Sequence, residues 1–293
     1  MFEYKSLRIS SLIICFVTVT FGCTTIKEQE FGLFGTRGEH IYGIGFAFSP
    51  RQSFGEPEAF GIISDNKVKM YEYNFSYDSW LRIIELDLAL PEGYTGVFSM
   101  GRLIGVIVDN TVHFYSYDDD TNSWFIESWL EMILPEGYTG VFSTGGNMGG
   151  VQVVLDNKVH FYSYEDNWVK ISELEFVLPK RYKAVFGVGG LIGVIIGNKV
   201  HFYGYDFDNG SWFIPEIKKL FLPVLHTNVF SIGTGIGTIN DNEDLYMDNF
   251  NWSKGRWLMD RVLRENLDAL EWRRERQRDF DRSRETYFPG RSW

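Results

Sequence analysis

The sequence predicts an all-β protein built from five copies of a small four-stranded sheet. Three observations lead to this fold class. Equivalent Phe, Pro and Trp residues recur at a constant spacing, each copy contains short runs rich in Val, Ile, Phe and Tyr, and Gly, Asp and Asn separate those runs. The chain has 293 residues, of which 44% are hydrophobic and 17% aromatic, which excludes a disordered chain.

The repeat has a period of 44 residues. Its anchors are Phe98, Phe142, Phe186 and Phe230, then Pro91, Pro135, Pro179 and Pro223, and then Trp80, Trp124, Trp168 and Trp212. A weaker copy covers residues 60–80; residues 45–48, rather than the stretch near Phe54, supply its opening strand, with an inserted loop at 49–58. A further copy starts at Asn228, so the chain holds five copies.

Each copy reads as four short strands, exemplified by residues 94–98, residues 103–108, the alternating run at 112–117, and a last strand that carries the Trp and ends in Ile-Leu-Pro. In the third strand, Val112 and Phe114 face one side, and His113 and Tyr115 the other. Tight turns with positive φ are expected between the second and third strands, at Asp109-Asn110, Asp156-Asn157 and Gly197-Asn198.

Four-stranded units of this length, repeated without helices, predict a five-bladed β-propeller over residues 39–257. One small sheet has two faces to cover, and its neighbours in a ring cover them. A linear β-solenoid is the alternative, although its repeats are usually shorter.

The N-terminus predicts an exported protein. Residues 1–23 combine Lys5 and Arg8 with a short apolar stretch, which suits a signal peptide better than a membrane span. The end of this segment resembles a bacterial lipobox, in which case Cys23 is lipidated and residues 24–38 form a linker. Ordinary secretion and an uncleaved anchor are the alternatives. Cys15 is the only other cysteine, so no disulfide is expected in the mature domain.

The C-terminal residues 258–293 predict a charged helical extension. Apolar residues recur there at helical spacing, at Leu258, Val262, Leu263, Leu267 and Leu270. Such an amphipathic helix would pack on the propeller, contact a partner, or lie on a membrane surface.

Charge and motif content narrow the function classes. The net charge of −11 argues against nucleic-acid binding. No catalytic motif, cofactor motif or metal-ligand spacing emerges, so we expect neither an enzyme, nor a cofactor, nor a metal site. His113, His160 and His201 are equivalent in three copies, but Lys69 and Tyr246 take their place in the other two, which favours a structural role.

The best candidates for ligand binding are polar turns that precede the repeated Trp. An indole can stack on the apolar face of a sugar ring, and Asn can hydrogen-bond its hydroxyl or acetamido groups. The candidates are Asn122, Trp124, Asn167, Trp168, Asn209, Trp212 and Trp80. In the alternative interpretation each Trp packs between blades and the polar residues only shape turns.

The layout of the second copy resembles tachylectin-type propeller lectins. It consists of Phe98, then Gly105-Val106, Asp109-Asn110, Val112 and Phe114-Tyr115, followed by Asn-x-Trp. This resemblance implies five blades that bind N-acetylated sugars between them. The run at residues 90–98 also resembles the hemopexin repeat, but that family has four blades, and this chain lacks its Gly-Asp-x-Tyr-Trp run and closing disulfide.

The sequence therefore predicts a noncatalytic, lectin-like protein of the cell envelope, or a secreted one. It would bind surface glycans or glycoconjugates through several equivalent sites and touch the membrane only through its lipid anchor. The alternative is an envelope scaffold that binds a protein partner through the propeller face or the C-terminal helix.

Overall fold

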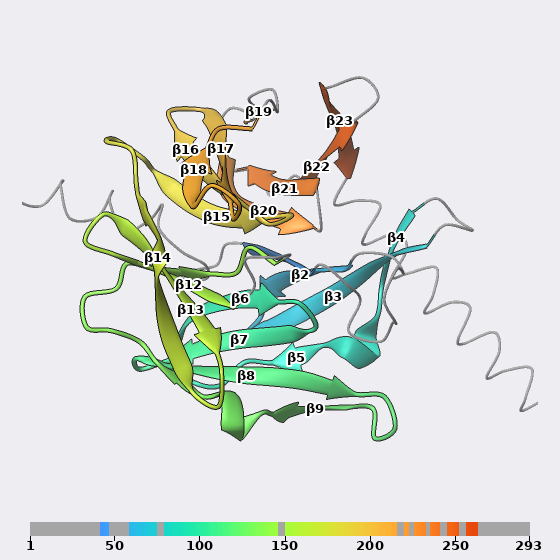
Figure 1. The fold of residues 1–293 in the computed structure, drawn as a ribbon. Coiled ribbons are helices and arrows are strands. Elements are labelled where there is room, and N and C mark those ends of the chain that lie inside the picture. The colour runs from blue at the N-terminus through green and yellow to red at the C-terminus, as the bar shows by residue number, and fades with distance from the viewer. Residues whose placement is uncertain are drawn as a thin grey trace, which may run out of the picture.

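The computed structural model of the chain describes residues 42–46, 59–74, 79–145, 150–215, 220–222, 226–232, 235–240, 245–251 and 256–262. Within these residues the chain forms five antiparallel sheets (Figure 1). The first four strands of each sheet pair in the order of the sequence, and in the first, second and fourth sheets a short fifth strand returns to pair with the third strand, beside the fourth. Antiparallel neighbours need only short connections, which the Gly, Asp and Asn residues of the repeat supply.

The sheets are numbered here from first to fifth along the chain. The first contains β1 (Tyr42–Phe46), β2 (Ala59–Ser64), β3 (Lys67–Asn74), β4 (Ser79–Arg82) and β5 (Leu88–Ala89). The second contains β6 (Tyr94–Met100), β7 (Leu103–Val108), β8 (Thr111–Asp118), β9 (Ser123–Ile126) and β10 (Met132–Ile133). The third contains β11 (Gly140–Phe142), β12 (Val151–Leu155), β13 (Lys158–Tyr164) and β14 (Trp168–Val177). The fourth contains β15 (Ala184–Val188), β16 (Leu191–Ile196), β17 (Lys199–Asp206), β18 (Ser211–Phe213) and β19 (Leu220–Phe221). The fifth contains β20 (His226–Ile232), β21 (Gly235–Asn240), β22 (Leu245–Asn251) and β23 (Arg256–Val262).

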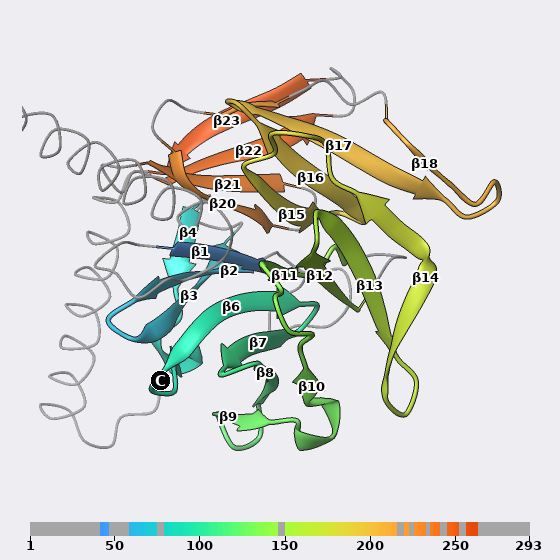
Figure 2. The ribbon, with the colours of Figure 1, turned by 90° about the vertical axis from the view of Figure 1, so that its left-hand side faces the viewer.

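The inner strands of the five sheets meet around a common centre. β1 contacts β6, β6 contacts β11, β11 contacts β15, β15 contacts β20, and β20 contacts β1. Figure 2 shows these strands near the middle of the molecule and β9, β14, β18 and β23 toward its periphery. The contact between β20 and β1 joins the last sheet to the first. In a linear solenoid the first and last repeats would not touch. The predicted all-β class and propeller-like arrangement are confirmed.

The core is divided into clusters that lie between neighbouring sheets. One cluster joins the first and second sheets, others join each following pair, and Phe60, Tyr71, Phe230 and Ile239 join the fifth sheet to the first. The third strand of the second sheet supplies two of them: Val112 and Phe114 pack toward the third sheet, and Tyr117 packs toward the first. Alternation along a strand thus gives each sheet two buried faces.

In three sheets the repeated Phe of the inner strand packs over a Gly on the second strand. Phe98 is paired with Gly105, and a Cβ on Gly105 would lie 2.5 Å from the Phe98 ring. Phe186 with Gly193 and Phe230 with Gly237 repeat this packing. In the third sheet the position opposite Phe142 is Gln152, a buried residue whose Oε1 accepts the Thr144 amide at 2.7 Å.

In four of the sheets the turn between the second and third strands holds the Leu of the Leu-Pro step that follows the sheet. Asp109, Asp156 and Gly197 have positive φ, which confirms the predicted turns. The carbonyl of the turn Asn accepts the amide of the Leu before Pro in four sheets, at 2.8–3.0 Å: Asn66 from Leu90, Asn110 from Leu134, Asn157 from Leu178 and Asn198 from Leu222. The turn Asn and the Leu-Pro step of the repeat are therefore joined by the same backbone hydrogen bond in these four sheets.

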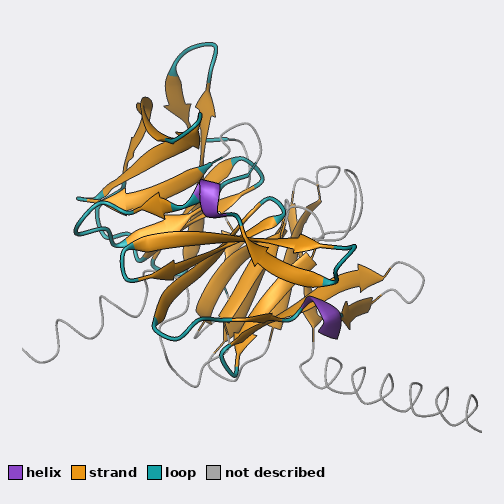
Figure 3. Ribbon diagram, turned by 90° about the horizontal axis from the view of Figure 1, so that it is seen from below, coloured by secondary structure: helices purple, strands orange, loops and turns teal. Residues whose placement is uncertain are grey.

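The outer edge is less regular than the repeat predicts. In the first two sheets the outer strand is interrupted by a 3₁₀ turn, η1 (Ile84–Leu86) or η2 (Ser128–Leu130), shown in Figure 3. In the third sheet β14 runs on through the same positions, and the ladder with β13 shifts register between Val159 and Phe161. Among the described residues, neither of these helical turns has the length and apolarity needed to cross a bilayer.

One predicted element is wrong where the structure describes it. Residues 258–262, assigned to the start of a C-terminal helix, belong to β23, which pairs with β22 along its whole length. The signal segment 1–23 with Cys15 and Cys23, the linker 24–38, and residues 263–293 lie outside the described residues.

Candidate functional site

The four predicted Trp residues lie at the boundaries between sheets. All four are half-buried, and each packs against the cluster of one boundary: Trp80 on the fifth–first, Trp124 on the first–second, Trp168 on the second–third and Trp212 on the third–fourth. The repeat therefore places one indole at four successive boundaries, beside the turn that joins the third and fourth strands.

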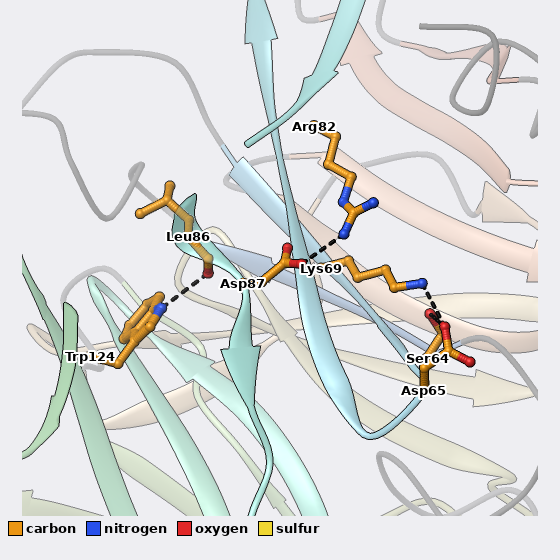
Figure 4. Close-up of polar contacts among 7 residues, drawn as sticks. All are labelled: Ser64, Asp65, Lys69, Arg82, Leu86, Asp87 and Trp124. Atoms are coloured by element: carbon orange, nitrogen blue, oxygen red, sulfur yellow. Dashed lines mark hydrogen bonds and ion pairs between the residues drawn. The ribbon is translucent and has the colours of Figure 1, made fainter. Parts of the chain in front are cut away.

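Three of these indoles donate a hydrogen bond to the backbone of the preceding sheet. The acceptors of the indole N–H groups are the carbonyls of Leu86 for Trp124 (3.0 Å), Leu130 for Trp168 (2.8 Å) and Glu175 for Trp212 (3.2 Å). Figure 4 shows the first of these, near the 2.7 Å ion pair between Arg82 and Asp87. Leu86 and Leu130 end the two 3₁₀ turns, where a carbonyl has left the sheet ladder. The indole satisfies that carbonyl and fastens one sheet to the next.

Aromatic neighbours fix the orientation of the indoles. Trp168 stacks on Phe114 of the preceding sheet, with ring centroids 5.5 Å apart and planes at 24°, and Tyr164 meets it edge-on. Trp212 packs on Phe161 with the ring planes tilted by 39°, and Tyr205 takes the place of Tyr164. The packing role of the repeated Trp, which the sequence left as an alternative, is present at these boundaries.

The predicted Asn residues lie in exposed turns next to the indoles. Asn122 has a φ of 52°, and its Oδ1 accepts the Tyr117 hydroxyl at 3.4 Å. The Asn209 amide donates to Asp206 Oδ1 at 3.1 Å, and the Asn167 carbonyl accepts the Glu165 amide at 3.0 Å. Each Asn shapes its own turn, and its side chain remains on the surface.

Two equivalent carboxylates organise the longer turns. Hydrogen bonds from the Thr121 hydroxyl and the Asp120 amide lower the pKa of Asp118. The Asn209 side chain and amide do the same for Asp206. Both carboxylates therefore stay ionised and give these turns a negative surface.

The repeated His residues contact carboxylates on the outer strand. His113 Nδ1 lies 3.2 Å from Glu131, and His160 Nδ1 lies 3.2 Å from Glu175, which also binds Lys158. Burial, followed by the nearby Lys170, lowers the pKa of His160. These are edge contacts within single sheets, and no group of three or more His, Cys, Asp or Glu among the described residues could hold a metal ion.

The structure adds an aromatic residue that the repeat pattern did not single out. Trp129 lies in η2 with 60% of its surface exposed, and its indole donates to Glu127 Oε2 at 2.7 Å. Tyr164 of the third sheet meets it edge-on at 5.3 Å. The sequence did hold a signal, since the equivalent positions in the neighbouring copies are Glu85 and Glu173.

The seven predicted site residues are thus brought together in pairs, one Trp with one Asn at three boundaries, with Trp80 at a fourth. The indole of each pair faces the core, and the Asn faces solvent. Their role in binding stays a prediction. Trp129 and Tyr164 add an outward-facing aromatic pair at the boundary between the second and third sheets.

No family model matches the chain, and no curated protein matches it. Among solved structures it is similar to the SapL1 lectin in complex with alpha methyl fucoside, at 13% identity over 78% of this chain and 81% of that one, with a TM-score of 0.42. The Aleuria aurantia lectin, a six-bladed propeller, matches at 13% identity over 76% and 78%, with a TM-score of 0.41. A putative 6-phosphogluconolactonase from Bacteroides fragilis matches at 9% identity over 72% and 69%, with a TM-score of 0.37. The propeller-like arrangement of this chain is evident from its own sheets and the clusters between them.

Proposed function

We propose that this protein is a noncatalytic, lectin-like carbohydrate-binding module, built as a five-bladed propeller. The observation that carries the proposal is the recurrence, at three successive boundaries, of an exposed Asn turn beside an indole that fixes the turn in place: Asn122 with Trp124, Asn167 with Trp168, and Asn209 with Trp212. Rigid, repeated polar turns suit weak binding of hydroxyl-rich ligands at several places at once.

The partners in this proposal are surface glycans or glycoconjugates. Several weak sites on one rigid body bind a repeating glycan by avidity, although each site alone is weak. The chain would be exported and would reach the membrane only through a lipid on Cys23, or be secreted. The signal-like residues 1–23 support this location.

The proposal is tested on a glycan array that includes N-acetylglucosamine and fucose. We expect the wild-type chain to bind, each single variant among Asn122→Gly, Asn167→Ala and Asn209→Ala to lose a few-fold in avidity, and the triple variant to lose nearly all of it. Gly at 122 keeps the positive φ of this position while removing the amide. Thermal unfolding of each variant checks that the sheets are intact.

The second candidate function is a scaffold that binds an envelope protein. It is favoured by exposed apolar side chains that recur on the outer strands, Phe125, Val169 and Phe213 in one row and Ile133, Val177 and Phe221 in another. A silent array would contradict the lectin proposal. Capture of an envelope protein that is lost on Phe213→Ser and Phe221→Ser would then support the scaffold.

A further inference from the structure

Trp129 departs from the repeat in both residue type and exposure. Glu85 and Glu173 occupy its place in the neighbouring copies, so the repeated fold does not need an aromatic residue there. In η2 the next residue, Leu130, is buried, whereas 60% of Trp129 is exposed. The indole therefore contributes little buried apolar area to folding.

The position of this exposed indole is nevertheless fixed from several sides. The indole N–H donates to Glu127 Oε2 at 2.7 Å, and the backbone carbonyl of Trp129 accepts a hydrogen bond from the Tyr164 hydroxyl at 2.9 Å. The next carbonyl, that of Leu130, accepts the Trp168 indole at 2.8 Å. The turn that carries Trp129 is thus held by two side chains of the third sheet, and little conformational entropy remains to be lost when a ligand binds.

The ring geometry favours a flat ligand. Tyr164 and Trp129 are T-shaped, with planes at 72°, so they do not form two parallel walls. The other neighbour of Tyr164, Trp168, is stacked on Phe114 and has a packing role already. A quaternary ammonium ion is best held by an aromatic cage. A single exposed indole suits instead the apolar face of a sugar ring.

The surrounding charges select among sugars. Glu127 is held against the indole, and Glu165 and Asp166 are exposed in the turn that follows Tyr164. These carboxylates would repel a uronic acid, a sialic acid or a phosphate, whereas the hydroxyls of a neutral sugar can donate to a carboxylate oxygen.

We propose that Trp129, with Glu127 and Tyr164, forms a single stacking platform that binds a neutral pyranose. This inference rests on the proposed carbohydrate-binding function, and it places the strongest contact at one boundary outside the repeated Asn–Trp pairs. The platform is a ligand-binding site and performs no chemistry.

The test measures the affinity of the full chain for the neutral glycan that gives the highest array signal, by titration calorimetry. We expect Trp129→Ala to weaken binding by about tenfold or more, because the stacking face is removed. Trp129→Phe keeps an aromatic face and should lose less. Ile214→Ala is the matched control, since Ile214 is 74% exposed just after the outer strand β18 but offers no ring. This control variant should bind the glycan as tightly as the wild-type chain, and every variant should have the same unfolding midpoint as the wild-type chain.

The outcomes separate this inference from the proposed function. If wild type binds neutral glycans and Trp129→Ala binds them equally well, the platform is refuted while the lectin function stands. If wild type binds no glycan on the array, both are refuted. Binding of acidic glycans only, or of choline in a manner lost on Trp129→Ala, would overturn the choice of a neutral pyranose.

Discussion

His160 is a residue at which the fold disfavours a charge. Its side chain is buried, with 7% of the residue exposed, and its Nδ1 has no hydrogen-bond partner among the described residues although Glu175 lies 3.2 Å away. Burial and the positive charges of Lys170 and Lys158 lower the pKa of His160, and together they outweigh the opposite effect of Glu175 and Asp156. The neutral imidazole is therefore the form that the sheet accommodates.

This shift predicts a loss of stability on mild acidification. The unfolded chain takes up the His160 proton at a higher pH than the folded chain, so the free energy of unfolding should fall as the pH drops below the ordinary His pKa of 6.5. His160→Gln should flatten that slope, as measured by urea unfolding at about pH 7.5 and about pH 5.5.

The matched control for this experiment is His113→Gln, at the equivalent position of the second sheet, where the side chain is more exposed. Glu175 does not confuse the measurement, because its hydrogen bond with Lys158 lowers its pKa and moves its titration to more acidic conditions. An unchanged slope in His160→Gln would assign the acid sensitivity to another group.

At the scale of elements, the outer edge of each of the first three sheets is fastened by the indole of the next sheet. Trp168 combines two contributions, the stack on Phe114 and the hydrogen bond to the Leu130 carbonyl. Phe at position 168 would retain much of the first and lose the second. The Leu130 carbonyl, which ends η2, would then lack that donor.

We expect Trp168→Phe to lower the free energy of unfolding by about 1–2 kcal/mol, the usual cost of a lost hydrogen bond at a partly buried site. Trp168→Ala should cost more, about 3–5 kcal/mol, because the stack is lost as well. Chemical denaturation measures both. Equal losses in the two variants would show that the hydrogen bond, and not the ring, carries the contribution. Because Ala also weakens the fold, it is a poor probe of binding at this position.

How far the sequence predicts these elements depends on whether the information is local. The strand predicted at residues 103–108 coincides with β7, because its aliphatic run lies between two turns. The helix predicted from residue 258 failed because Leu258 and Val262 are four residues apart, a spacing that places side chains on one face of a helix and equally on one face of a strand. Pairing with β22, a tertiary contact, decides between them.

The candidate site also has one part that the local sequence predicts and another part that depends on tertiary contacts. The spacing of the repeat predicts that Asn122 lies in a turn directly before Trp124, and the structure places Asn122 in that turn and Trp124 in β9. It cannot predict that the indole reaches the Leu86 carbonyl, because that acceptor depends on a 3₁₀ turn in another sheet. Trp129 was detectable as a departure from the repeat, but its exposure depends on how η2 packs.

At the scale of the whole molecule, stability depends on the closure of the ring. The fifth sheet meets the first through Phe60 and Phe230, whose ring centroids are 6.1 Å apart and which are both fully or almost fully buried. Tyr71 and Trp80 pack on Phe60 from the same sheet. Two segments far apart in the sequence thus share one cluster, and a chain that did not close would leave both faces in water.

Closure predicts a measurable coupling between these two Phe residues. Phe60→Leu and Phe230→Leu should each lower the free energy of unfolding by roughly 1–2 kcal/mol, and the double variant should differ from their sum by about 0.5–1 kcal/mol, because each ring packs on the other. Phe60→Leu combined with Phe161→Leu is the control, since Phe161 belongs to the cluster between the third and fourth sheets and should give additive losses. Additivity in both pairs, measured by urea unfolding, would mean that the fifth sheet does not close on the first in solution, and the faces of β2 and β21 would then need another cover.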